Sequence, residues 1–295
     1  MRFRALVYDT CRELFYRRTL MFYFGIVTVT HLLLLLAMQT DAADGVITSI
    51  KVFGMQASGG GGSFRLNGTD PGVMAIDAAT VARGIESAVA WMLYPMGVIL
   101  GLFATASLVP RLLEKGSIDL LLSKPVSRPA ILVSRWLGGF LVAAANMVYL
   151  VAGVGAILGF KLGVWHWGFL FSGLMMAAYF GALLGFLVLW GVLMRSTTIG
   201  IMMTVGVYFV SLAVRAPHAY PDWANAITSQ VGRLIGKTLV EVLYHLLPRT
   251  WDFGMVVTNL LLHRPVESYM PVVGTMGSGL GALLIAVFLF RRTDF

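Results

Sequence analysis

The chain has 295 residues, of which 58% are hydrophobic and only 12% are charged, and its mean hydropathy is +0.82. Soluble domains carry about 25% charged residues, so this composition excludes a soluble protein and indicates an integral membrane protein. The formal net charge of +8 does not indicate a nucleic-acid-binding protein. Much of the basic excess flanks apolar runs, and no soluble basic module is present.

The chain begins with a basic stretch, residues 1–18, followed by an apolar run from Met21 to Met38. That run is longer than the ~7–15 residues of a signal-peptide core, and no Ala-x-Ala site follows, so we expect a retained first span. Residues 1–18 predict an amphipathic helix on the cytosolic interface, with a plain basic flank as the alternative. The apolar residues that recur there at helical spacing are Phe3, Leu6, Val7 and Leu14.

Six apolar runs are long enough to cross a ~30 Å hydrocarbon core as helices. They are approximately Thr19–Met38, Ala90–Val109, Ile131–Leu158, Trp167–Met194, Thr198–Val214 and Pro271–Phe290. The predicted fold class is therefore an all-α membrane protein with six transmembrane helices in a single domain, residues 1–295. The lone cysteine, Cys11, excludes an intrachain disulfide and is expected to be a small packing residue.

The basic residues set the expected orientation. Most of them lie before the first span, between the second and third, after the fourth and after the sixth, and the other short connection has only Lys161. The positive-inside rule then places both termini in the cytosol. We expect an extracytoplasmic loop at 39–88 with a glycine-rich centre, a cytosolic loop at 110–130, and an extracytoplasmic segment at 215–270 with an amphipathic helix before the sixth span.

No catalytic, metal or nucleotide site is recognisable. The segment Gly232–Thr238 resembles a phosphate-binding loop, but three rather than four residues separate its glycines and no strand precedes it. No two of the five histidines are three to five residues apart, which excludes a helical metal pair. We expect His31, inside the first span, to form a hydrogen bond to another helix.

The acidic residues exclude several kinds of transporter. No Asp or Glu occurs between Asp119 and Asp222, and we expect none in the interiors of the other spans. Proton and cation pathways usually need intramembrane carboxylates, so a proton-coupled carrier, a cation channel and an intramembrane protease are disfavoured. Asn146 is the notable polar residue inside a span and is expected to form an interhelical hydrogen bond. The energy for any transport would then come from another chain.

The segment Leu113–Arg128 is the most informative part of the sequence, because it is a charged stretch between two apolar runs. Gly116 permits a turn before Ser117, which could cap a short helix, and Pro125 would end that helix. Such a helix could dock into a groove of a cytosolic partner, and a plain loop is the alternative. Its apolar face would be Ile118, Leu120, Leu121 and Leu122, beside the charged residues Glu114, Lys115 and Asp119.

The same segment resembles the cytosolic loop of type-two ABC exporter permeases, whose pattern is roughly acid-x-Gly-Thr/Ser-aliphatic-acid-Leu-Leu-Leu-Ser-x-Pro-Val-Ser-Arg. Leu246–Phe253 resembles the family's Leu-Leu-Pro-x-x-x-x-Phe element, and Phe290–Phe295 resembles its usual ending. The resemblance covers essentially the whole chain and is specific only at the loop. It departs before the glycine, where relatives often carry several glutamates and this chain has only Glu114.

The resemblance implies a permease subunit without catalytic activity, in the inner membrane of a bacterium. It implies two cytosolic ABC ATPase subunits as partners, which bind ATP and Mg, and a second permease subunit, expected to form a homodimer. No cofactor is expected in this chain, and an extracytoplasmic accessory protein is an open partner. The implied ATPase-coupling residues are Glu114, Lys115, Gly116, Ser117, Asp119, Leu121, Leu122, Pro125, Ser127 and Arg128.

Three functions remain open from the sequence. The first is a permease that couples ATP hydrolysis by a separate ATPase to export of a lipid, glycan, peptide or drug. The second is a mechanical transmitter that drives an extracytoplasmic protein, as similarity to the permease of the nitrous-oxide-reductase maturation system implies. The third is a membrane scaffold or enzyme that works without an ATPase.

Overall fold

The computed structural model describes residues 2–16, 18–43, 46–52, 55–58, 63–66, 76–113, 127–226, 229–262 and 264–292. Its helices are α1 (Arg2–Phe15), α2 (Arg18–Ala37), α3 (Ala78–Thr105), α4 (Leu108–Leu112), α6 (Arg128–Leu162), α7 (Trp167–Met194), α8 (Thr197–Ala219), the 3₁₀ helix η1 (Pro221–Ala226), α9 (Gln230–Leu246), α10 (Thr250–Leu261) and α11 (Met270–Arg292). Its strands are β1 (Met38–Ala43), β2 (Val46–Val52), β3 (Met55–Ser58), β4 (Ser63–Leu66) and β5 (Ile76–Asp77).

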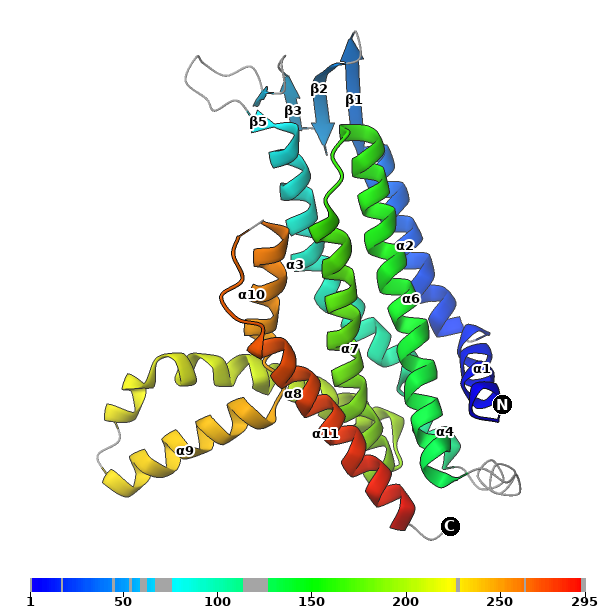
Figure 1. Ribbon diagram of the computed structural model, residues 1–295, viewed down its shortest axis with the longest axis vertical. Helices are drawn as coiled ribbons and strands as arrows, with labels where there is room; N and C mark the ends of the chain where they lie inside the picture. The colour runs from blue at the N-terminus through cyan, green and yellow to red at the C-terminus, as the bar shows by residue number, and fades with distance from the viewer. Residues whose placement is uncertain are drawn as a thin grey trace.

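Six helical segments of the described chain are long and apolar enough to cross a membrane, which confirms the six predicted spans. They are α2, the stretch Ala82–Leu112 of α3 and α4, α6, α7, α8 and α11. Both chain termini lie at one end of the bundle and the strands lie at the other (Figure 1). We call these the terminus end and the sheet end.

Helix α7 is the centre of the bundle, because 83% of its apolar window is buried inside the protein, against 28% for α11. The two helices touch through glycines. A Cβ atom on Gly185 would lie 2.3 Å from the Gly279 carbonyl oxygen, and one on Gly279 would lie 2.3 Å from the Ala182 Cα. Transmembrane helices gain their packing energy from such close approach, since lipid supplies no hydrophobic force between them.

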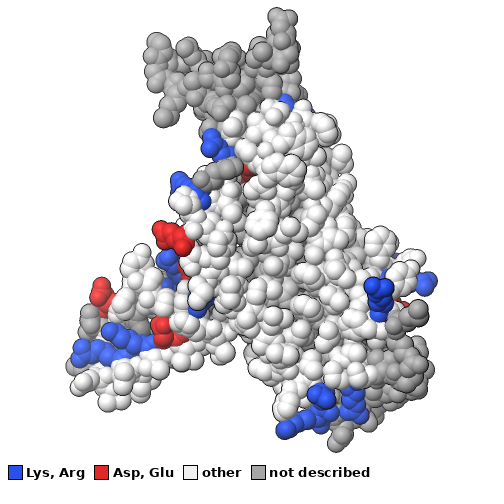
Figure 2. All heavy atoms as spheres, in the orientation of Figure 1, with Lys and Arg blue, Asp and Glu red and all other residues white. Residues whose placement is uncertain are grey.

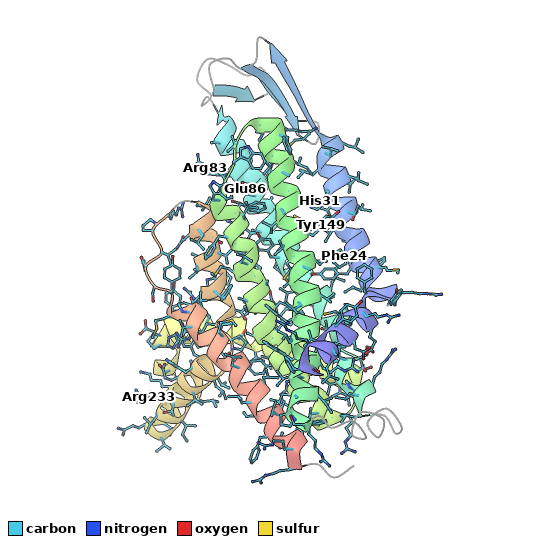
Figure 3. The ribbon with its side chains drawn as sticks, turned by 45° about the vertical axis from the view of Figure 1, so that its right-hand side comes forward. Phe24, His31, Arg83, Glu86, Tyr149 and Arg233 are labelled. Carbon is cyan, nitrogen blue, oxygen red and sulfur yellow. The ribbon has the colours of Figure 1, made fainter. Side chains whose placement is uncertain are left out.

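Helices α2 and α6 are joined by His31, which points from α2 toward α6 (Figure 3). Its Nε2 lies 3.0 Å from the Leu150 carbonyl, and its ring meets Tyr149 edge-on at 4.9 Å, so the predicted interhelical hydrogen bond is confirmed. At the sheet end, Lys161 donates to the carbonyls of Leu35 and Met38. The Leu35 carbonyl in the last turn of α2 therefore has a partner, which gives a structural reason for a lysine in the last turn of α6.

The stretch between α2 and α3 contains a small antiparallel sheet that the sequence reading did not predict. Its strands follow chain order, β1-β2-β3-β4-β5, and the register of the first pair runs from Met38 opposite Val52 to Ala43 opposite Val46. The glycine-rich centre predicted here, residues 59–62, lies outside the described residues. The all-α prediction holds for the membrane-spanning part, and the sheet is an addition at one end.

Helices α8 and α9 form an arm that projects sideways from the bundle (Figure 1). None of the residues of α9 is buried, and α9 ends at Leu246, just before Pro248. Charged side chains gather on this arm and near the terminus end, while the face of the bundle between them is uncharged (Figure 2). A helix is therefore present where the amphipathic segment was predicted, and its extracytoplasmic placement stays a prediction.

Candidate functional site

The predicted coupling loop connects α4 to α6, and the described residues on either side of it lie at the terminus end (Figure 1). Most of its predicted coupling residues, Glu114, Lys115, Gly116, Ser117, Asp119, Leu121, Leu122 and Pro125, lie outside the described residues. Ser127 is exposed and directly precedes α6, and its carbonyl accepts from the Ile131 amide at 3.3 Å. Arg128 is the first residue of α6. A force on the loop would therefore act on the end of α4 and the start of α6.

Helix α1 also packs on the beginning of α6. Glu13 forms an ion pair with Arg135, and the buried Thr10 lies against Gly138, where a Cβ atom would come within 2.6 Å of the threonine Cγ2. The Cys11 thiol lies 3.8 Å from the Gly138 carbonyl oxygen. Helix α1 and the loop are thus both attached to one helix, α6.

Cys11 should report whether α1 is docked, because burial raises the pKa of its thiol and only the thiolate is nucleophilic. We expect Cys11 to react with iodoacetamide at neutral pH more slowly than a free cysteine. The Gly138→Leu variant should displace α1 and increase the rate, while Gly84→Leu, which has open space around it, should leave it unchanged. Because Cys11 is the chain's one cysteine, mass-spectrometric detection of the alkylated protein measures this directly. Equal rates in all three proteins would contradict the α1–α6 contact.

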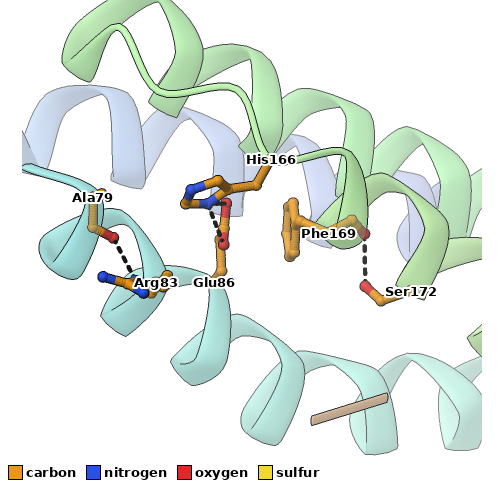
Figure 4. A network of polar contacts seen from close by, with 6 residues as sticks. All are labelled: Ala79, Arg83, Glu86, His166, Phe169 and Ser172. Atoms are coloured by element: carbon orange, nitrogen blue, oxygen red, sulfur yellow. Dashed lines mark hydrogen bonds and ion pairs between the residues drawn. The ribbon is translucent and has the colours of Figure 1, made fainter. Parts of the chain in front are cut away.

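A buried carboxylate–imidazole pair joins α3 to the start of α7 near the sheet end (Figure 4). The Nδ1 of His166 lies 2.9 Å and 3.0 Å from the two carboxylate oxygens of Glu86, which is only 2% exposed. Arg83, one turn earlier on α3, donates from its Nε to the Ala79 carbonyl at 3.2 Å. Charged groups are costly in a membrane unless they are paired, and here the imidazole is the partner of the carboxylate.

The expectation that the spans contain no acid in their interiors was therefore wrong. The hydropathy run begins at Ala90, but α3 begins at Ala78, and the candidate span starts at Ala82 and includes Glu86. The helix extends past the apolar run because the polar residue on it finds a partner. The sequence contained a signal for this longer helix. Glu86, Ala90 and Tyr94 follow one another at intervals of four residues, the spacing of neighbours on one face of a helix.

Below this pair, four helices enclose a cavity of about 210 Å³, between α3, α7, α8 and α10. We call it the aromatic cavity, because its largest lining residues are Trp91, Tyr94, Tyr179, Tyr208, Trp251 and Phe253. None of the described residues that line it carries a charge.

The hydroxyl groups around the aromatic cavity bond mainly to one another. The Tyr179 and Thr250 hydroxyls are 2.7 Å apart, and Ser211 of α8 also bonds to Thr250. The Tyr94 hydroxyl lies 2.6 Å from that of Ser172. These bonds tie α10 to α7 and α8, and α3 to α7, and they satisfy the hydroxyls of Tyr94, Tyr179 and Thr250 without a ligand.

The rim of the cavity is polar and lies next to the arm. Trp91 and Trp251, 58% and 42% exposed, meet edge-on with ring centroids 6.4 Å apart. The Arg215 guanidinium lies 5.9 Å from the Trp251 ring and 3.4 Å from Asp252, which also accepts from the Tyr244 hydroxyl at 2.7 Å. Burial and the Asp252 carboxylate raise the pKa of Tyr244 to about 12, so this hydroxyl remains a donor at neutral pH.

Asn146 was predicted to form an interhelical hydrogen bond, and its side-chain amide interacts with the Tyr23 hydroxyl of α2. The residue is completely buried, and this contact is too loose to satisfy either amide atom as a full hydrogen bond. It lines a second cavity of about 20 Å³ between α2, α3, α6 and α7, beside Tyr23, whose hydroxyl donates to the Gly97 carbonyl at 2.9 Å. This volume has room for about one water molecule, far less than the aromatic cavity.

The described residues contain no group of three or more His, Cys, Asp or Glu side chains placed to hold a metal ion. The site is therefore defined by two features: the α1–α6 contact at the terminus end and the aromatic cavity within the membrane-spanning part. Neither arrangement provides an activated nucleophile or an acid–base pair beside an open cavity.

A comparison with curated protein sequences found no match. A family model described as "ABC-2 family transporter protein" matches residues 16–293, nearly the whole chain. That range includes all six candidate spans, the loop between α4 and α6, and the aromatic cavity. The chain is a multi-pass membrane protein that belongs to the ABC-2 family of transporter proteins, the type-two ABC permeases.

Proposed function

We propose that this protein is the permease subunit that couples ATP hydrolysis by a separate cytosolic ATPase subunit to export of a substrate. The family match over residues 16–293 carries the proposal. Two ATPase subunits would bind ATP and Mg, two copies of this chain would form the permease pair, and both termini would face the bacterial cytosol. The chain itself would perform no covalent chemistry and hold no cofactor.

Coupling would begin at the loop between α4 and α6. The acidic residues Glu114 and Asp119 would pair with cations of the ATPase, and the apolar residues Leu121 and Leu122 would enter its groove. Movement of the loop would pass to Arg128 and the start of α6, and α1 would move with it through the Glu13–Arg135 pair. Helix α6 packs along α7, so the displacement would reach the helices that enclose the aromatic cavity.

Affinity purification from native membranes in mild detergent tests this proposal. The wild-type chain should retain a stoichiometric ATPase with Walker motifs, identified by mass spectrometry. The Glu114→Ala, Asp119→Ala double variant should lose most of it, because both acidic contacts at the rim of the interface are removed.

Two results would change the assignment. Retention of the ATPase by the double variant would rule out these two residues as the coupling contacts. Absence of an ATPase from both preparations, with the complex otherwise intact by size, would instead favour a scaffold or enzyme. A matched variant of two basic residues at the other end of the chain, Arg291→Ala with Arg292→Ala, controls for a general effect of lost surface charge.

A second candidate function is mechanical transmission to an extracytoplasmic protein. The strands β1–β5, which project beyond the helices at the sheet end, favour it because a sheet outside the helix bundle offers backbone hydrogen-bonding groups to a partner (Figure 1). The same purification distinguishes the two functions. A stoichiometric extracytoplasmic protein bound together with the ATPase would favour transmission.

A further inference from the structure

The aromatic cavity lies where a molecule from the membrane could enter it. Three of its four walls, α3, α7 and α8, are candidate spans. Its two rim tryptophans, Trp91 and Trp251, are exposed on the protein surface, as are the lining residues Gly254 and Met255. The cavity therefore opens on the surface of the helix bundle.

The lining determines which chemistry fits. Its described residues carry no charge, and the hydroxyls of Tyr94, Tyr179, Thr250 and Thr258 already bond within the protein. Among the described residues this leaves the Tyr208 hydroxyl as the one lining hydroxyl without a bond. A glycan or a peptide placed there would bury polar groups without partners, which is costly. A hydrocarbon chain that moves in from lipid exchanges one apolar environment for another and leaves no polar group unpaired.

The rim adds a site for a polar end. Arg215 and Asp252 form an ion pair beside Trp251 and offer both signs of charge at the edge of the cavity. The Arg215 side chain is 34% exposed and the Asp252 side chain is 21% exposed. Both can therefore also contact a neighbouring headgroup. Pockets that combine an apolar interior with a few polar groups at one edge are typical small-molecule sites.

We propose that the aromatic cavity binds the hydrocarbon chain of a lipid-like substrate, whose polar end lies at Arg215 and Asp252. This inference rests on the proposed transport function and names its substrate class. It separates a lipid-like substrate from the glycan and peptide classes that the sequence leaves open.

Photolabelling tests the proposal on the full complex purified from native membranes and placed in phosphatidylcholine vesicles. The probe is a palmitic acid analogue that carries a diazirine midway along its chain, and the labelled peptides are mapped by mass spectrometry. We expect labels on α3 around Trp91 and on α10 around Gly254, and excess unlabelled palmitic acid should compete for both. Labelling at a fixed site saturates and is therefore reduced by the competitor, whereas labelling through surface contacts with bulk lipid is not.

Gly254→Leu should fill the cavity, because Gly254 lines it and a Cβ there meets nothing within 4 Å. We expect at least about a ten-fold reduction of the competed labelling, since this corresponds to a modest loss of binding free energy. The matched control is Gly25→Leu on the exposed side of α2, which also has open space and should label like the wild type.

Labels confined to exposed faces such as Met202 and Met203 of α8, or labels that Gly254→Leu does not reduce, would overturn the proposal. ATPase co-purification is measured on the same samples and keeps the two ideas apart. A bound ATPase without competed labelling rejects the lipid-like substrate alone. Competed labelling without any ATPase supports the site and rejects the ATP-driven function.

Discussion

The Gly279→Ala variant is expected to lose most of its folded protein, although it adds a single methyl group. The new Cβ would lie 2.3 Å from the Cα and 2.6 Å from the Cβ of Ala182 on α7. Overpacking typically lowers stability by about 1–3 kcal/mol. We expect a loss at or above the upper end here, because the atoms that the new Cβ meets include the Ala182 backbone, which cannot move aside by changing rotamer. Relief would require α11 to move away from α7, the most buried helix.

Gly277→Ala, two residues away on the same helix, is the matched control. A Cβ at Gly277 meets nothing within 4 Å, and alanine is favoured over glycine in a helix by about 0.5–1 kcal/mol. This variant should match or slightly exceed the wild type in thermal stability, measured as the Tm of the detergent-purified protein. Equal Tm values for Gly279→Ala and Gly277→Ala would show that α7 and α11 are not in backbone contact.

The His166→Leu variant is expected to lower the stability of the protein by about 3–5 kcal/mol, as does removal of one partner of a buried ion pair. The carboxylate of Glu86 would remain 2% exposed and lose the imidazole that donates to it. A double-mutant cycle with Glu86→Leu isolates the pair. The double variant should be more stable than His166→Leu alone, because the buried charge is then absent.

Resistance to denaturation by sodium dodecyl sulfate provides the measurement for this cycle. His245→Leu is the control, because the His245 side chain is 54% exposed and its ion pair with Glu241 lies at the surface. Surface pairs contribute about 0–1 kcal/mol, so this variant should resemble the wild type. Additive losses in the Glu86 and His166 double variant would mean that the two side chains do not stabilise each other.

His31 in the first span and Asn146 in the third both contact a neighbouring helix, but only His31 reaches a backbone carbonyl. His31 was expected to bond to a neighbouring helix and does so through the Leu150 carbonyl, a backbone group that any adjacent helix could have supplied. Asn146 was given the same role, and its amide meets the Tyr23 hydroxyl of α2, which already donates to the Gly97 carbonyl, at the edge of a small cavity. Spacing along one helix does not say what the facing helix presents at that height.

Sequence alone determined the six spans, since each is a continuous apolar run long enough to cross the bilayer, and hydropathy is a property of the local chain. It also determined that both termini lie at one end, because the number of spans is even. The family resemblance at the loop between the second and third spans agrees with the family match. Local information was sufficient for each of these.

Only the tertiary structure decided where polar groups and empty space lie inside the bundle. Glu86 belongs to a span because His166, 80 residues later in the chain, supplies its partner. The aromatic cavity exists because aromatic side chains from four helices meet without filling the volume between them. Such pairings depend on helix packing across long sequence separations, and a hydropathy window covers only one helix at a time.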